Sequence, residues 1–291
     1  MGMKVRIGCH VSIAGSLAAS VSRAISRECR TFQIFTRNPR GWNYKEVAEE
    51  DAAAFREAVA TSGMDPAVAH MPYLPNLASP KEEVYEKSVS AFCAEVERCH
   101  LLGIPYLVTH LGSTLGTPPE EGQDRIVRAL GAALDMNAAG VTILLENTAG
   151  CRNTIGNRFD EIGSILDEAG GKARLGICFD TCHAFAAGYD LRTAASVNSV
   201  MKECDAEVGS QRIHLVHLND AKAPLASGRD RHEHLGLGEI GPEGLSAVLH
   251  HPALRHLPFI CETPVDERRD DLGNIRYAAF LAGGTSGAAP L

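Results

Sequence analysis

The sequence predicts a single α/β domain folded as a (β/α)8, or TIM, barrel, and three observations lead to that prediction. Eight short apolar runs recur along the 291 residues, as buried parallel strands do. A segment with helical spacing follows each run, and no linker or change of composition divides the series. An open, doubly wound sheet is the alternative, but eight regular units in one domain favour a closed barrel. We expect this domain to span residues 1–282 and a flexible tail to occupy residues 283–291.

The predicted strands are apolar almost from end to end, which is typical of strands covered on both faces. Four of the eight finish in a histidine or an acidic residue. In chain order they are Val5–Val11, Thr31–Thr36, Ala67–His70, Tyr106–His110, Val141–Glu146, Leu175–Asp180, Ile213–Asn219 and Pro258–Thr263.

The predicted helices lie between these strands and carry recognisable end signals. Ser79 and Pro80 supply a cap and a first-turn proline, and Gly140 and Gly170 follow two helix ends. The eight segments are Ile13–Glu28, Glu46–Ser62, Lys81–Leu102, Glu120–Ala139, Arg158–Ala169, Thr193–Glu207, Pro242–His250 and Asp266–Leu281.

The composition is that of a soluble globular protein, with 45% hydrophobic and 22% charged residues. No apolar run approaches the roughly 20 residues that span a bilayer, and the first residues lack a signal-peptide pattern. Nine cysteines without paired spacing indicate reduced thiols, so we expect a cytoplasmic protein. The net charge of −8 argues against nucleic acid, but less so if several carboxylates bind cations.

Nine potential metal ligands follow the carboxyl ends of the predicted strands, where barrels of this kind place their active sites. A single strand-end histidine or acid is usually structural. Structural roles do not explain nine such residues together, because four buried carboxylates without cations would be prohibitively unstable. The set is His70, His110, Glu146, Asp180, His183, His217, Asp230, His232 and Glu262.

The donor types indicate the chemistry. Imidazole and carboxylate together suit divalent cations, and the absence of cysteine from the set favours a catalytic over a structural site. Nine donors are too many for one ion, so two or three are expected. Multinuclear sites with ions roughly 3.5–4 Å apart activate water and stabilise leaving oxygens at phosphorus. The sequence therefore predicts hydrolysis of a phosphoester.

Four motifs carry a family resemblance that covers Val5 to about Leu281. The chain resembles endonuclease IV, the metal-dependent apurinic/apyrimidinic endonuclease of base-excision repair, and none of the nine positions departs from the family pattern. The motifs are Glu146–Gly150 (ENTAG), Asp180–His183 (DTCH), His217–Asp220 (HLND) and Asp230–His234 (DRHEH).

The resemblance implies three zinc ions, for which manganese or iron could substitute. It assigns His70, His110 and Glu146 to the first ion, and Glu146, Asp180, His217 and Glu262 to the second. His183, Asp230 and His232 would hold the third. Glu262 and Glu146 would be the catalytic carboxylates, with Glu262 orienting the hydroxide that attacks 5′ to an abasic site. The products would carry a 3′-hydroxyl and a 5′-deoxyribose phosphate.

The resemblance also implies contacts with damaged double-stranded DNA through Arg40, Tyr73, Leu74 and Arg231. An aromatic and an aliphatic wedge can replace the stacking that is lost when an abasic nucleotide leaves the helix. Pro39 and Pro72 precede two of these positions and would stiffen their loops. The family further implies a monomer that acts in the cytoplasm, associated with the nucleoid.

Several other polar residues receive supporting or structural roles. His10 is expected at the mouth, and Asn219, Asp220 and Glu233 are expected to orient ligands. Strand phase predicts that His214 faces the helices, and His234 is not assigned as a ligand.

Two other functions fit parts of the pattern. A sugar isomerase or epimerase would need one metal, which Glu146, Asp180, His217 and Glu262 could hold, but the other five donors would then be idle. A binding protein that recognises damaged DNA without cutting it would have lost a ligand, and none is lost.

Overall fold

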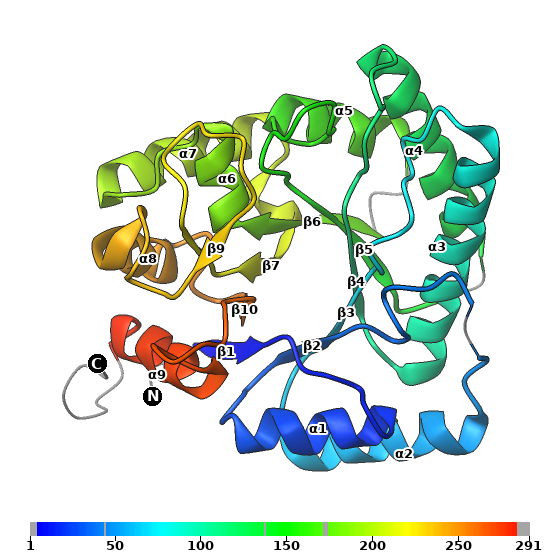
Figure 1. Cartoon of the computed structure of the whole chain (residues 1–291), viewed down its shortest axis with the longest axis horizontal. Helices are drawn as coiled ribbons and strands as arrows, with labels where there is room; N and C mark the ends of the chain where they lie inside the picture. The colour runs from blue at the N-terminus through cyan, green and yellow to red at the C-terminus, as the bar shows by residue number, and fades with distance from the viewer. Residues whose placement is uncertain (1–4, 44, 137, 171–173, 284–291) are drawn as a thin grey trace.

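Eight parallel strands form the inner wall of the structure, in the order β1-β10-β7-β6-β5-β4-β3-β2, and the helices lie outside this ring (Figure 1). The computed structural model describes residues 5–43, 45–136, 138–170 and 174–283. Strand neighbours follow chain order throughout, so the predicted (β/α)8 barrel is confirmed. The strands are β1 Arg6–Cys9, β2 Phe32–Ile34, β3 Ala67–His70, β4 Tyr106–Thr109, β5 Thr142–Glu146, β6 Leu175–Asp180, β7 Ile213–His217 and β10 Pro258–Cys261.

The main helices begin and end within a few residues of the predicted bounds. Two begin later than predicted because their caps lie inside the predicted ranges: Ser16 accepts from Ala19 N (3.1 Å), and Asp270 from Gly273 N (2.8 Å). The helices are α1 Leu17–Ser26, α2 Glu49–Ser62, α3 Glu82–Leu102, α4 Pro119–Leu134, α5 Phe159–Glu168, α7 Ala194–Glu207, α8 Gly241–His250 and α9 Asp271–Leu281.

Four short elements were not predicted from the sequence. They are the helix α6 Thr181–Ala187, a 3₁₀ turn Ser210–Arg212, and the antiparallel pair β8 Asp220–Ala221 and β9 His232–Glu233. Helix α6 and strand β9 carry His183 and His232, so both matter for the candidate site.

The core inside the barrel explains why ligands gather at one end. Six buried apolar side chains, one from each of six strands, pack together inside the ring: Val68, Val108, Leu144, Cys178, Leu215 and Ile260. Side chains two residues apart on a strand share a face. The residues two positions later are His70, His110, Glu146, Asp180, His217 and Glu262. Six of the nine predicted ligands therefore form the layer directly above this apolar layer.

The side chain of His214 does not point in the direction that regular alternation along the strand predicts. Ile177 pairs with Ile213 but Cys178 pairs with Leu215, so His214 is an extra residue in an irregular stretch of β7. Its ring stacks on Tyr106 at 5.7 Å, and Tyr106 packs against the apolar layer inside the barrel. The prediction that His214 faces the helices is therefore wrong.

The barrel closes between β1 and β2 through close backbone approach rather than a regular ladder. His10 and Gln33 form an isolated parallel bridge, in which Val11 N donates to Gln33 O at 2.8 Å. A Cβ on Gly8 would lie 1.7 Å from the carbonyl oxygen of Thr31. Only glycine fits at this position of the seam.

Two features bear on the remaining expectations. Of the predicted flexible tail, residues 283–291, only Gly283 lies within the described residues. No helix in the described ranges is long and apolar enough to cross a membrane.

We expect Gly8→Ala to lower the free energy of unfolding by at least the upper end of the about 1–3 kcal/mol typical of overpacking, because the clash is with backbone. Urea denaturation measures this. Gly131→Ala is the matched control, since a Cβ at this position of α4 would meet nothing within 4 Å outside its own helix, and it should stabilise the protein by about 0.5–1 kcal/mol. Equal unfolding free energies for the two variants would refute the role of Gly8.

Candidate metal centre

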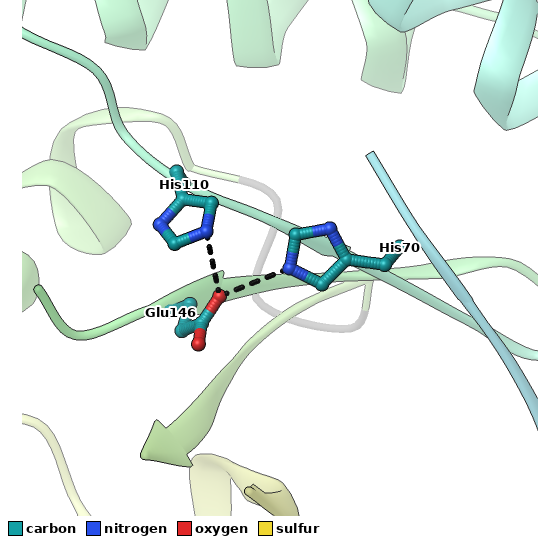
Figure 2. Close-up of side chains that lie close together, drawn as sticks. All are labelled: His70, His110 and Glu146. Carbon is teal, nitrogen blue, oxygen red and sulfur yellow. Dashed lines mark hydrogen bonds and ion pairs between the residues drawn. The ribbon is translucent and has the colours of Figure 1, made fainter. Parts of the chain in front are cut away.

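Glu146 lies at the centre of the site, at the end of β5, and its carboxylate is almost completely buried. Figure 2 shows His70 and His110 pointing at the same oxygen of this carboxylate. The Nε2 atoms of the two rings lie 3.2 and 3.4 Å from Glu146 Oε2. The three side chains come from neighbouring strands and form a group that could hold one ion.

The second oxygen of Glu146 faces a different group. His217 Nδ1 lies 2.9 Å from Glu146 Oε1, and 3.3 Å from Glu262 Oε2. Asp180 Oδ2 lies 3.8 Å from the same nitrogen. Glu146, Asp180, His217 and Glu262 thus offer donor atoms within 4.8 Å of one another. A carboxylate with donors on both sides has the geometry of a bridging ligand.

The third group is built from the short elements beyond the strand ends. Asp180 caps α6 by accepting from His183 N (2.7 Å), which fixes His183 above the strand ends. Asp230 Oδ1 lies 3.2 Å from His183 Nε2 and 3.3 Å from His232 Nε2. The Nε2 atom of His232 is buried and makes no well-aligned hydrogen bond among the described residues, so Asp230 contacts it only as an ion pair. A buried imidazole nitrogen that faces carboxylate oxygens in this way fits a metal ligand.

Cys182 also comes within 4.8 Å of donor atoms from Asp230 and His232, although it is not in the predicted ligand set. Burial raises the pKa of this thiol above its usual range, which disfavours the thiolate. Its Sγ donates to the carbonyl of Arg231 (3.5 Å), so the structure gives the thiol a different partner.

Hydrogen bonds to oxygen acceptors fix the orientation of four of the five imidazole rings. Each of the four has a neutral oxygen acceptor on one ring nitrogen, so that nitrogen carries the proton and the other offers its lone pair. In His70, His217 and His232 the protonated nitrogen faces away from the carboxylates, whereas His183 Nδ1 also lies 3.4 Å from Glu146 Oε1. The acceptors are Met71 O for His70 (2.7 Å), Asn147 O for His183 (3.0 Å), Glu262 O for His232 (2.9 Å) and Gln33 Oε1 for His217 (2.9 Å).

The electrostatics show what the cluster needs. Burial alone would lower the pKa of His217, but the surrounding anionic groups, Glu262 and Glu146 among them, raise it well above its usual value. Burial alone would also lower the pKa of His232, but the interaction with Asp230 raises it to about 9. In Glu146, burial favours the neutral acid, but His110 and His217 hold the pKa well below its usual range. Positive charge is required here, and bound cations would supply it.

Of the expected supporting residues, Asn219 contacts the ligands directly. Its Nδ2 donates to Asp180 Oδ2 at 2.7 Å, and its Oδ1 accepts from Glu262 N at 2.8 Å. Asn219 therefore contacts one predicted ligand and the backbone of another, as expected for a residue that orients them.

Asp220 and Glu233 act on loops instead. Asp220 accepts backbone N–H groups from Gly236, Gly238, Ile240 and Gly241, which shapes the turn before α8. Glu233 pairs with Arg268 at 3.0 Å. The expectation that these two residues orient ligands directly is wrong.

Of the DNA-contacting candidates, Tyr73 and Leu74 line the hollows at the mouth, and Arg231 follows Asp230. Tyr73 is 64% exposed and Leu74 39% exposed, and both lie in the loop after β3. The Tyr73 ring meets Phe35 edge-on at 5.1 Å, and Phe35 meets His70 at 5.8 Å. Arg40 and Arg231 are exposed. Arg231 donates to the carbonyl of its neighbour Asp230 (2.9 Å), which places it beside the third group.

Two hollows meet at the barrel mouth. A cavity of about 340 Å³ opens over the ligands and is lined by His10, His183, His232 and Glu262 among others. A groove of about 300 Å³ lies beside it, between the loops after β3, β4 and β5. Tyr73, His110, His183 and Asp230 line both hollows, so the cavity and the groove meet along these four side chains. His10 lies at the mouth as expected.

Comparison with known proteins gives a consistent result. A family model described as a xylose isomerase-like TIM barrel matches residues 21–280. A probable endonuclease 4 of Methanoculleus marisnigri is 57% identical over 280 residues, covering 96% of this chain and 99% of the relative. The corresponding protein of Methanosphaerula palustris is 54% identical, covering 96% and 98%.

Solved structures agree. The crystal structure of endonuclease IV from Thermus thermophilus is 38% identical, covers 96% of this chain and 99% of its own, and has a TM-score of 0.84. A D-tagatose 3-epimerase-like protein has a TM-score of 0.72 over 96% and 98%, but is 20% identical and shares the fold alone.

We expect zinc to stabilise the protein, because a ligand that binds only the folded state adds about 2.7 kcal/mol at a hundred times its Kd. Protein stripped by a strong chelator should gain several degrees in Tm when Zn²⁺ is restored. Differential scanning calorimetry measures the shift, and the same concentration of Mg²⁺, which prefers oxygen ligands, is the control. A Tm that does not respond to Zn²⁺ would exclude a metal site.

Proposed function

The chain belongs to the endonuclease IV family, and on this premise we propose that it cleaves DNA at abasic sites during base-excision repair. The bond broken would be the phosphodiester 5′ to the abasic site, leaving a 3′-hydroxyl and a 5′-deoxyribose phosphate. One observation carries the proposal. The nine predicted ligands, five histidines and four carboxylates, gather at one barrel mouth, each within 4.0 Å of at least one other.

We assign three metal ions to this mouth. Glu146 would bridge the first group, with His70 and His110, and the second group, with Asp180, His217 and Glu262. His183, Asp230 and His232 would hold the third ion. The buried Nε2 of His232, which faces Asp230, and the four imidazoles that donate to oxygen acceptors support this assignment. Zinc suits the donor set best, and manganese or iron could replace it.

Such ions supply hydroxide at neutral pH and neutralise the charge that develops on phosphate oxygens. The residues of the chain position the reactants. Glu262 is 21% exposed and lines the cavity, so its carboxylate can orient the attacking water and take its proton. Glu146 is buried and acts through charge and geometry alone. We therefore assign the proton-handling role to Glu262.

The damaged strand would enter from the side of Tyr73 and Leu74. An abasic nucleotide leaves the helix easily, since it has no base to unstack. Tyr73, with Leu74 beside it, would fill the space left in the duplex, while Arg40 and Arg231 contact phosphates. We further propose that the protein acts as a monomer in the cytoplasm, where it would reach the nucleoid.

A sugar epimerase is the alternative that the fold alone permits. It would need only Glu146, Asp180, His217 and Glu262 around one ion. Among the remaining five donors, His70, His183 and His232 donate to oxygen acceptors as His217 does, and His183 and His232 come from elements outside the barrel strands. Elemental analysis separates the two functions, because the nuclease should contain three ions per chain and an epimerase one.

The decisive measurement is incision of a duplex with a single abasic site. We expect the metal-loaded protein to cut on the 5′ side, and stripping with a strong chelator to abolish cutting until zinc returns. Glu262→Gln should bind the duplex with unchanged Kd but lower kcat by about 10²–10⁴-fold, the usual contribution of a general base.

Glu267→Gln is the matched control, because this exposed glutamate lies in the same loop and touches none of the ligands. It should cut at the rate of the wild type. Full turnover by Glu262→Gln would remove Glu262 from the chemistry, and no incision by the metal-loaded wild type would remove the proposed function.

Tyr73→Ala should reduce the preference for abasic over intact duplex, since a buried aromatic stacking contact is worth about 1–3 kcal/mol per base. A five-fold or greater loss in the ratio of the two Kd values is expected in competition binding. Ile25→Ala, which removes an exposed apolar side chain of α1, should leave the ratio unchanged. An unchanged ratio for Tyr73→Ala would exclude the wedge.

A further inference from the structure

Gln33 in β2 is not among the predicted site residues, yet its carboxamide is completely buried and contacts three residues of the mouth. Its Oε1 lies 2.9 Å from His217 Nε2. Its Nε2 lies 2.7 Å from Glu262 Oε1 and 3.0 Å from His10 Nδ1. One side chain therefore joins strands β2 and β7 and the residues that follow β1 and β10.

The three contacts define the direction of every hydrogen bond. His217 Nδ1 faces the carboxylates of Glu146 and Glu262, so its lone pair is the one available to an ion. The proton of neutral His217 then lies on Nε2 and is donated to Gln33 Oε1. The two N–H bonds of the amide remain for Glu262 and for His10 Nδ1. A flipped amide would set its N–H against that of His217 and turn its oxygen toward a carboxylate.

The arrangement fixes two ligands of the same ion group. Accepting from Nε2 selects the His217 tautomer that can bind a metal through Nδ1. Donating to Oε1 of Glu262 fixes the rotation of that carboxylate, which leaves Oε2 toward His217 at 3.3 Å. Without Gln33, the buried Nε2–H of His217 would lose its acceptor, and Glu262 would be free to rotate into the cavity.

We propose that Gln33 is the positioning residue of the second metal group, acting on His217 and Glu262 together. The proposal rests on the three-ion site assigned above. Partners behind metal ligands typically contribute 10–100-fold in metal affinity or activity. Gln33 is expected to act at the upper end of this range, because it holds two ligands at once.

Gln33→Met tests the proposal, because methionine has a similar length but neither donates nor accepts strongly. One of the three ions should bind 10–100-fold more weakly in titrations against a competing chelator, while the other two keep their affinity. In incision assays at limiting zinc, kcat should fall by a similar factor with KM unchanged. Excess zinc should restore part of kcat.

Thr31→Val is the matched control. It removes one buried hydrogen bond from the residue before β2, Thr31 Oγ1 to Pro66 O at 2.6 Å, and touches no ligand. It should lower the unfolding temperature without changing metal affinity or kcat. A purely structural role for Gln33 would give the same result for Gln33→Met as for this control.

Gln33→Ala is the second variant, to be used where Gln33→Met does not fold, since water can enter the space it leaves. Three ions bound with wild-type affinity, together with kcat within twofold, would overturn the proposal in either variant. The metal titration needs no DNA. A wild type that binds three ions but cuts no abasic duplex would therefore refute the proposed function and leave the role of Gln33 testable.

Discussion

The burial of carboxylates at the barrel mouth is the constraint on which the rest of the site depends. Glu146 and Asp180 are almost completely buried, and Glu262 is largely so. An isolated buried carboxylate costs several kcal/mol, so the structure surrounds each one with imidazoles and amide donors. Four of these imidazoles donate to oxygen acceptors through one ring nitrogen, which leaves the lone pair of the other nitrogen toward the acids. Such a cluster needs added positive charge, and divalent cations that accept the imidazole lone pairs would provide it.

The barrel supplies this arrangement from a simple repeat. Six apolar side chains fill the interior, and the next inward-facing residue on each strand is a potential ligand. The apolar layer excludes water from below, so the predicted ligands meet solvent at the mouth, through the cavity and the groove beside it. Strands alone place six donors. The remaining three come from α6 and from the loop that ends in β9, and these form the third group at the rim, near the exposed Tyr73 and Arg231.

The sequence predicted the fold and the inner ligands because strands have a regular period and short apolar runs mark their ends. It could not predict α6 or the β8–β9 pair, which are too short to show periodicity. The alternation of side chains along a strand gave the wrong direction for His214, since one extra residue in β7 reverses the direction of its side chain. Asp220 was expected to orient a ligand, but its carboxylate accepts hydrogen bonds from four backbone N–H groups in the turn before α8. Gln33 looked like any polar residue in a strand, and only tertiary contacts reveal its partners.

The seam between β1 and β2 connects the fold to the chemistry. It has one isolated bridge, between His10 and Gln33, where other strand pairs have regular ladders. The backbone of Gln33 makes this bridge while its side chain holds His217 and Glu262. The close approach of the β1 and β2 backbones at Gly8 therefore affects the candidate site as well as the closure of the barrel. It sets how far Gln33 lies from β7 and β10, and so the spacing of the second metal group depends on closure of the barrel.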